Sequence, residues 1–205
     1  MPTHGRPQRH NLTIALIATA MLLLVGSAIA QDADLLARIE ARLIPAEGTQ
    51  TDYGIPLSLD SLPQFVDWWY TLVPSVENDP RYVEALSSLV APCCDDNLAF
   101  KCCCEDDEGQ ACNIIRSAKG LAAYLIMEFD YETQALADGV LQWLRFARPD
   151  YYVAVALEEA GENPQKYGLT TKGSCYRFMC NTPISEGGCG GMKKLIEPAI
   201  TGTGG

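Results

Sequence analysis

The sequence predicts an all-α protein: a small helical bundle with a cysteine-rich loop and an irregular, disulfide-stapled C-terminal tail. Three observations support this fold class. Apolar residues recur at helical spacing in several segments between residues 31 and 161, and proline or glycine ends most of these segments. Runs that alternate apolar with polar residues are short, which argues against strands. Six of the nine cysteines fall between Pro92 and Arg116.

The first thirty residues are predicted to be a signal peptide. Two arginines precede an apolar stretch at residues 12–25, and Ala28-Ile29-Ala30 provides the small residues of a signal-peptidase site. We therefore expect cleavage after residue 30 and a periplasmic or extracellular protein. In the alternative, residues 12–30 remain as a membrane anchor, because an apolar stretch of this length nearly spans a bilayer.

The composition of the mature chain excludes several functions. Cleavage removes Arg6 and Arg9, so 13 of the 15 basic residues remain against 26 acidic ones and the net charge moves from −11 to −13. Such an acidic surface excludes nucleic acid as a partner, and a membrane is a partner only if the N-terminal segment stays uncleaved. Both histidines, His4 and His10, are also removed. The mature chain therefore lacks the residue needed for Cys–His or Ser–His–Asp catalysis, for His-ligated zinc and for covalent haem attachment.

The chain is expected to divide into an N-terminal helix and linker (31–59), a helical bundle (60–161) that contains the cysteine-rich loop (92–112), and a Cys/Gly-rich tail (162–205). Helices are predicted over residues 31–44, from Asp60 or Ser61 to Pro74, from Pro80 to Pro92, from Asn113 to Phe129, from about Tyr131 to Ala147 with Asp130 as its cap, and from Tyr151 to Ala160 with Gly161 ending it.

The apolar positions predict which side of each helix is buried. In the Pro80 helix, Val83, Leu86 and Val90 should face inward. In the Tyr131 helix, the inner face should hold Leu136, Val140, Trp143 and Leu144. The stripe on the Asn113 helix is the clearest: Ile114, Ile115, Ala118, Leu121, Ala122, Leu125 and Ile126 should face inward, with Arg116, Lys119 and Glu128 outside it.

Thiol redox chemistry is the first interpretation of the cysteine cluster. Its candidate reactive residues are Cys93, Cys94, Cys102, Cys104 and Cys112. Cys112 stands where a helix should begin, a position that stabilises a thiolate. However, the chain contains no Cys-x-x-Cys pair, and acidic residues surround the thiols. Cys112 alone is therefore more typical of one half of a structural disulfide.

Soft-metal binding and disulfide stapling are the alternatives. Copper or zinc would be held by Cys93, Cys94, Cys102, Cys103 and Cys104, since thiolates select Cu(I) and also bind zinc. The contiguous spacing within each run departs from ordinary zinc sites. In an exported chain, nine cysteines indicate disulfides, and an odd number leaves at least one thiol free, paired between chains or bound. The redox and stapling interpretations require no cofactor.

The two cysteine runs on either side of Leu98, the Arg116-bearing helix and the acidic start of the next helix together resemble the small thiol subunit of bacterial cytochrome c maturation (CcmH-like), over about residues 80–155. The resemblance implies a three-helix bundle that presents a dithiol to a thiol-bearing exported protein, an apocytochrome, before haem attachment. It assigns the thiol role to Cys93 or Cys94 with Cys102 or Cys104. The start of the loop at Pro92 is also similar to exported proteins with a Pro-Cys-x-Cys-Gly-Cys motif.

Overall fold

The structure is a computed structural model that describes residues 33–92, 100–101, 111–173 and 180–192. The chain divides into two compact units, residues 1–38 and residues 39–205. Residues 33–38 of the first unit are helical, and an ion pair joins Arg38 to Asp34 one turn earlier. The predicted signal peptide lies outside the described residues.

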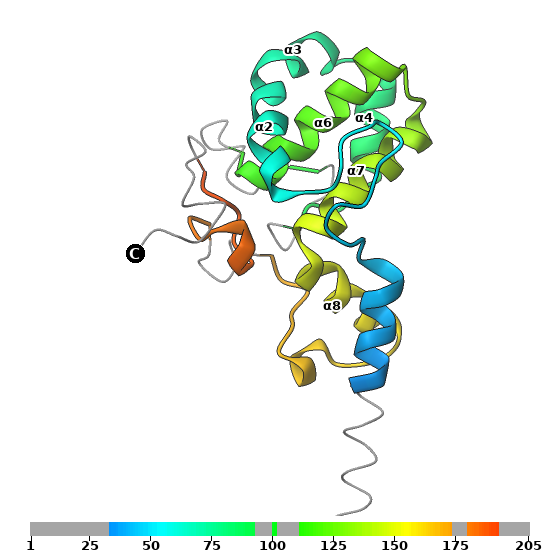
Figure 1. The fold of residues 1–205 in the computed structure, drawn as a ribbon, viewed down its shortest axis with the longest axis vertical. Coiled ribbons are helices and arrows are strands. Elements are labelled where there is room, and N and C mark those ends of the chain that lie inside the picture. The colour runs from blue at the N-terminus through cyan, green and yellow to red at the C-terminus, as the bar shows by residue number, and fades with distance from the viewer. Residues whose placement is uncertain (1–32, 93–99, 102–110, 174–179, 193–205) are drawn as a thin grey trace, which may run out of the picture. The chain divides into compact units, whose positions relative to one another are not determined.

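Every regular element among the described residues is a helix, so the all-α prediction is confirmed (Figure 1). Besides helical residues 39–43, the second unit holds α2 (Leu62–Thr71), α3 (Val73–Val76), α4 (Pro80–Ser87), α6 (Asn113–Phe129), α7 (Thr133–Ala147) and α8 (Pro149–Glu159), with 3-10 turns η1 (Leu59–Ser61), η2 (Pro164–Tyr167) and η3 (Ile184–Glu186). None of the helices in these described parts is long and apolar enough to cross a membrane.

Helix α6 is the centre of the bundle, and α2, α3, α4 and α7 all pack against it (Figure 1). All seven residues of its predicted apolar stripe are buried. A Cβ added at Gly120 would lie 1.9 Å from the carbonyl oxygen of Phe65 and 2.7 Å from the backbone nitrogen of Trp69. The backbones of α2 and α6 therefore meet at Gly120, where any side chain would be too large.

The inner face predicted for α7 is also confirmed. Leu136, Val140, Trp143 and Leu144 are each fully buried. The indole Nε1 of Trp143 donates to Ser117 Oγ at 2.9 Å, and that hydroxyl donates to the carbonyl of Ile114 at 2.8 Å. The hydroxyl of α6 thus satisfies the one polar atom that the buried indole brings into the core.

The segment predicted as one helix from Asp60 or Ser61 to Pro74 forms two helices. Ser61 does precede α2, but its side chain makes no capping hydrogen bond, and α2 ends at Thr71. Pro74 lies in the first turn of α3. Proline is compatible with this position because the amide groups of a first turn have no partner inside the helix.

Helix α4 begins as predicted, but it ends at Ser87 rather than at Pro92 and buries a different face from the predicted one, so that Leu89 and Val90 lie beyond its end. Asp79 accepts a capping hydrogen bond from the Arg81 amide, and Pro80 is the first helical residue. Leu86 is buried, but Val83 and Val90 are 50% and 52% exposed, so their predicted inward placement is wrong. The buried side chains are Tyr82, Ala85, Leu86 and Leu89. The large ring of Tyr82 contributes more buried area than a valine, and it sets the rotation of the helix.

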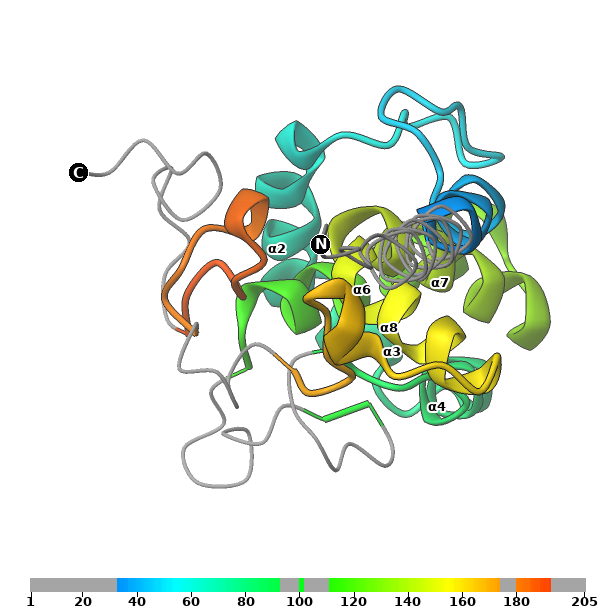
Figure 2. The same cartoon turned by 90° about the horizontal axis from the view of Figure 1, so that it is seen from below.

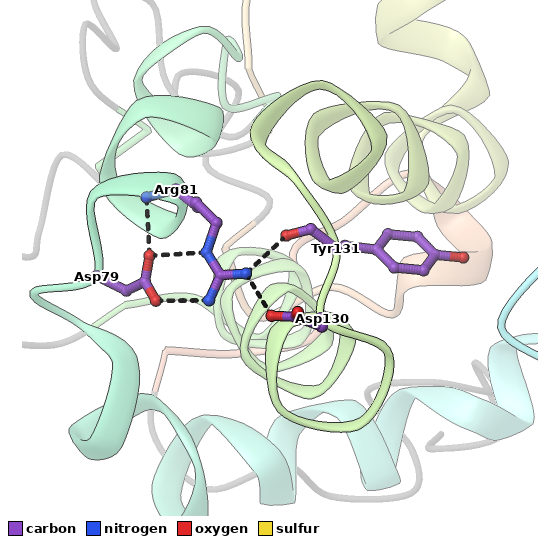
Figure 3. Close-up of polar contacts among 4 residues, drawn as sticks. All are labelled: Asp79, Arg81, Asp130 and Tyr131. Carbon is purple, nitrogen blue, oxygen red and sulfur yellow. Dashed lines mark hydrogen bonds and ion pairs between the residues drawn. The ribbon is translucent and has the colours of Figure 1, made fainter.

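Asp130 does not cap α7 as predicted. It ends α6 in the left-handed conformation (φ 53°, ψ 42°), and Glu132 is the residue that precedes α7. The Asp130 carboxylate accepts a hydrogen bond from Arg81 Nη1 at 2.7 Å, and Arg81 also forms an ion pair with Asp79 at 2.9 Å (Figure 3). One guanidinium therefore ties the start of α4 to the end of α6. Hydrogen bonds from Arg81 also lower the pKa of Asp79.

Helix α8 runs from Pro149 to Glu159, so it begins two residues before the predicted start, and Gly161 follows its C-cap Ala160 as the predicted end signal. Gly161 has φ +80°, and its amide donates to the carbonyl of Glu158. The amide of Glu162 donates to the carbonyl of Leu157, which completes a Schellman motif.

Candidate functional site

The cysteine-rich loop attaches to the bundle at three described places. Cys93, Cys94, Cys102, Cys103 and Cys104 lie outside the described residues. The attachment points are Ala91–Pro92 before the first cysteine run, Phe100–Lys101 between the two runs, and Ala111–Cys112 at the end of the loop. At each point at least one residue is buried in the core.

Arg148 holds the start of the loop. It lies between α7 and α8 with its side chain fully buried, and its Nη1 donates to the carbonyl of Pro92 at 3.2 Å. The other side of the guanidinium pairs with Asp150 through bonds of 3.1 and 3.2 Å. The Tyr152 hydroxyl adds a bond of 3.3 Å to the carbonyl of Val90. The junction of α7 and α8 therefore fixes the backbone that leads directly into Cys93.

Phe100 anchors the middle of the loop. Its side chain is fully buried in the core although its backbone has φ +52°, a conformation that costs energy in any residue other than glycine. Burying a phenylalanine ring contributes about 1.5–3 kcal/mol, which offsets that cost. The sequence indicated a loop with few apolar residues to hold it, and the burial of Phe100 was not predicted. The one signal was the short apolar stretch Leu98-Ala99-Phe100 between acidic residues and a lysine.

Cys112 forms the end of the loop. It directly precedes α6, as predicted from the helical pattern, and its side chain makes no capping hydrogen bond. The residue is fully buried. A helix start stabilises a thiolate, but thiol exchange also requires that a second sulfur reach the first. Burial therefore favours the structural interpretation of Cys112.

The C-terminal cysteine segment, residues 180–192, packs against the first turn of α6 (Figure 2). The Asn113 amide donates to the carbonyl of Gly191 at 3.0 Å, and the buried Asn113 side chain donates to the carbonyl of Gly190. Cys112 adjoins the first residue of this pair, and Cys189, also fully buried, precedes Gly190. The backbones of the loop end and the tail thus meet at one end of α6. The sequence did not predict where the tail packs.

This segment is more compact than an irregular tail. The amides of Gly188, Gly190 and Gly191 donate to the carbonyls of Pro183, Thr182 and Cys180, which folds the chain back on itself. A Cβ added at Gly188 would lie 2.1 Å from the carbonyl oxygen of Thr182, so only glycine fits there. Ile184 is 3% exposed and joins the hydrophobic core. The glycine cluster therefore serves close packing.

Arg116 is buried, so its predicted place outside the apolar stripe is wrong. It is 4% exposed, and its guanidinium lies over the Trp69 ring at 4.9 Å and near the Tyr70 ring at 5.7 Å. Its Nη2 donates to the carbonyl of Met192 at 2.9 Å. Aromatic faces and a backbone carbonyl take the place of water around the charge. The run Trp68-Trp69-Tyr70 on α2 supplies both of these rings. This aromatic run is the sequence feature that could have indicated such an environment.

Described side chains line at least three surface grooves, but they form no metal cluster. Among the described residues, no group of three His, Cys, Asp or Glu side chains is arranged to hold a metal ion. Two grooves, of about 410 and 430 Å³, share Asp138 and Gln142 on α7. The third, also of about 430 Å³, lies beside Arg116 and is lined by Trp69, Tyr70, Val73, Pro74, Glu77, Tyr82 and Lys119.

Comparison with known proteins gives no relative for this chain: no family model, no curated protein and no solved structure matches it.

Proposed function

We propose that this chain is an exported protein that handles thiols and disulfides, with Cys93, Cys94, Cys102 and Cys104 as its reactive residues. One observation carries the proposal: both cysteine runs begin within two residues of a buried anchor. Cys93 directly follows Pro92, whose carbonyl Arg148 holds, and Cys102 comes two residues after the buried Phe100.

Such anchoring suits thiol exchange better than stapling alone. A reactive group works best when the elements beneath it are rigid, because less ordering is required when the partner arrives. The hydrogen bond from Arg148 fixes the chain before the first run, and the buried ring of Phe100 fixes it before the second run. The expected functional pair joins one run to the other, since directly adjacent cysteines rarely bond to each other.

The proposed reaction exchanges one disulfide for another. A thiolate from one run attacks a disulfide sulfur of the partner, which forms a mixed disulfide and releases a partner thiolate. A thiolate from the other run then attacks its own chain's sulfur in the mixed disulfide. This second step releases the second partner thiolate and leaves a disulfide in this chain. Two electrons pass to the partner, and the released thiolates take up two protons from water.

The test is alkylation of the native mature protein, with each labelled cysteine located by mass spectrometry. After mild reduction, Cys93 or Cys94 and Cys102 or Cys104 should react quickly, and reoxidation should protect them again. Cys112 and Cys189 should react only after denaturation, because both are fully buried. Equilibration in glutathione buffers should give one two-electron potential for the pair.

Serine variants separate the roles. Removing both candidates of one run, as in Cys93→Ser/Cys94→Ser or Cys102→Ser/Cys104→Ser, should abolish the reversible pair and leave the melting temperature nearly unchanged. Cys112→Ser serves as the matched control and should leave the pair intact. Two results would overturn the proposal. Stoichiometric copper or zinc that protects several thiols would establish the metal interpretation. An absence of reducible cysteines outside denaturing conditions would leave a stapled structural domain.

A further inference from the structure

The groove beside Arg116 is unusually aromatic for a surface of this acidic protein. Trp69, Tyr70 and Tyr82 line it together with Val73 and Pro74. Tyr70 is 53% exposed, the largest exposure among the large hydrophobic residues of the described chain. Residues from α2, α3, α4 and α6 all contribute, so the groove belongs to the rigid part of the bundle. Aromatic walls of this kind favour an occupant with aliphatic side chains.

The described chain ends at the edge of this groove. Arg116 Nη2 holds the carbonyl of Met192 at 2.9 Å, and the same guanidinium lies 4.9 Å from the centre of the Trp69 ring. The residue after Met192 therefore starts within one side-chain length of the groove wall. Lys119, one turn beyond Arg116 on α6, lines the groove itself.

The sequence that follows Met192 matches the groove in chemistry and length. It reads Lys193-Lys194-Leu195-Ile196-Glu197-Pro198-Ala199-Ile200 and then becomes polar and glycine-rich. Eight extended residues reach about 26 Å. The wall from Trp69 to Glu77 runs over the end of α2 and the short helix α3, so its eight backbone steps span less than the same number of extended residues. Glu77 is exposed and forms no ion pair with a described residue, so it can receive either lysine.

We propose that Lys193–Ile200 docks in this groove, with its aliphatic side chains against Trp69, Tyr70 and Val73 and a lysine at Glu77. Docking removes two apolar surfaces from water at once, the aromatic wall and the Leu-Ile pair. Docking would also extend the contacts that residues 190–192 make with Asn113 and Arg116 of α6. The C-terminal region would then be held both before and after Met192. The inference does not depend on the proposed thiol activity.

The test compares the full-length mature chain with its Leu195→Asp/Ile196→Asp variant. In the variant, amide hydrogen exchange in residues 62–76 should rise at least several-fold, and acrylamide should quench Trp69 more strongly. The same quenching in a Trp69→Phe background isolates the signal from Trp68 and Trp143. Thr201→Asp/Thr203→Asp, in the polar end of the tail, is the matched control and should leave both measurements unchanged.

A charge exchange tests the orientation. Glu77→Lys should weaken docking of the tail and raise amide hydrogen exchange in residues 62–76. Adding Lys193→Glu/Lys194→Glu should restore the slow exchange of these residues. Equal exchange in the full-length chain and the Leu195→Asp/Ile196→Asp variant would overturn the proposal. Protection that grows with protein concentration would also overturn it, because the occupant would then be the tail of a second copy. All variants should keep the helical circular-dichroism signal of the parent.

Discussion

Gly120 sets how closely the two most tightly packed helices approach. The carbonyl of Phe65 lies where its side chain would be, so α2 and α6 touch backbone to backbone. Gly139 on α7 is different, because an added Cβ there would meet only side-chain atoms, Leu125 Cδ1 at 3.0 Å and Tyr53 Cε1 at 3.9 Å. A side-chain end can rotate away, whereas a backbone carbonyl in a packed helix cannot.

We therefore expect Gly120→Ala to lower the free energy of unfolding by about 2–3 kcal/mol through overpacking. Alanine favours a helix over glycine by about 1 kcal/mol, which is too little to offset the collision. Gly139→Ala, the matched control, should change stability by less than about 1 kcal/mol. Urea unfolding followed by circular dichroism measures both. Equal stability of the Gly120→Ala protein and the parent would contradict the close approach of α2 and α6.

Two arginines show why single residues were the hardest to place from the sequence. Arg116 and Arg148 are charged, and a charged residue is normally assigned to the surface. Each is buried because its surroundings replace water: tryptophan, tyrosine and a carbonyl for Arg116, and Asp150 with the Pro92 carbonyl for Arg148. These partners are up to 76 residues away in the chain. Helical periodicity carries no information about them.

At the scale of elements, the Arg81 cluster joins α4 to the turn between α6 and α7. Arg81 is hydrogen-bonded to Asp79 within its own helix start, to Asp130 and, at 3.5 Å, to the carbonyl of Tyr131 (Figure 3). The hydrogen bonds from Arg81 hold the pKa of Asp79 below its usual value. A carboxylate whose pKa is lower in the folded state stabilises the fold above its unfolded pKa, and that contribution is lost as the pH falls.

Stability should therefore decline as the pH falls below about 4, the ordinary pKa of an aspartate. Asp79→Asn should flatten this decline, because asparagine keeps the helix cap but does not titrate. Asp67→Asn, which removes an exposed carboxylate of α2, is the control and should keep the slope of the parent. Urea midpoints at pH 7, 5, 4 and 3 provide the measurement. An identical acid slope in the Asp79→Asn protein would show that Arg81 does not favour the charged Asp79.

The elements were predicted well wherever one apolar stripe determines the helix. On α6 and α7, aliphatic residues repeat over four turns, and all predicted inner residues are buried. On the short α4, two valines suggested a face that the larger Tyr82 overrides. The start of α7 was misassigned for a related reason, since Asp130 has the residue type of a cap but its carboxylate is used by Arg81.

At the scale of the whole molecule, the cysteine-rich loop is secured to the core through Phe100. The burial of its ring joins residues that the sequence assigns to a polar loop to the same core as α6 and α7. Sequence patterns predicted that the loop and the tail exist, but not where they attach. The attachments join segments that are 56 to 77 residues apart, and no local pattern encodes such pairings.

Phe100→Ala should lower the free energy of unfolding by about 3–5 kcal/mol, the usual cost of deleting a buried aromatic ring. The rate at which Cys102 and Cys104, which follow this anchor, react with alkylating reagents should also change. Phe129→Ala removes a ring that is 42% exposed and should cost less than about 1 kcal/mol. Thermal unfolding together with timed alkylation distinguishes the two. A stable Phe100→Ala protein with unchanged alkylation rates would show that Phe100 is not an anchor.

The contact between Asn113 and Gly190–Gly191 has a consequence for how the chain is made. The first turn of the central helix is completed by residues synthesised 77 positions later. A chain that emerges from the N-terminal end can form the later turns of α6 and its contacts with α2. The side chain and the backbone amide of Asn113, however, stay without these acceptors, the carbonyls of Gly190 and Gly191, until those residues appear. The region around Cys112 is therefore among the last parts of the bundle to close, after every cysteine of the chain has been synthesised.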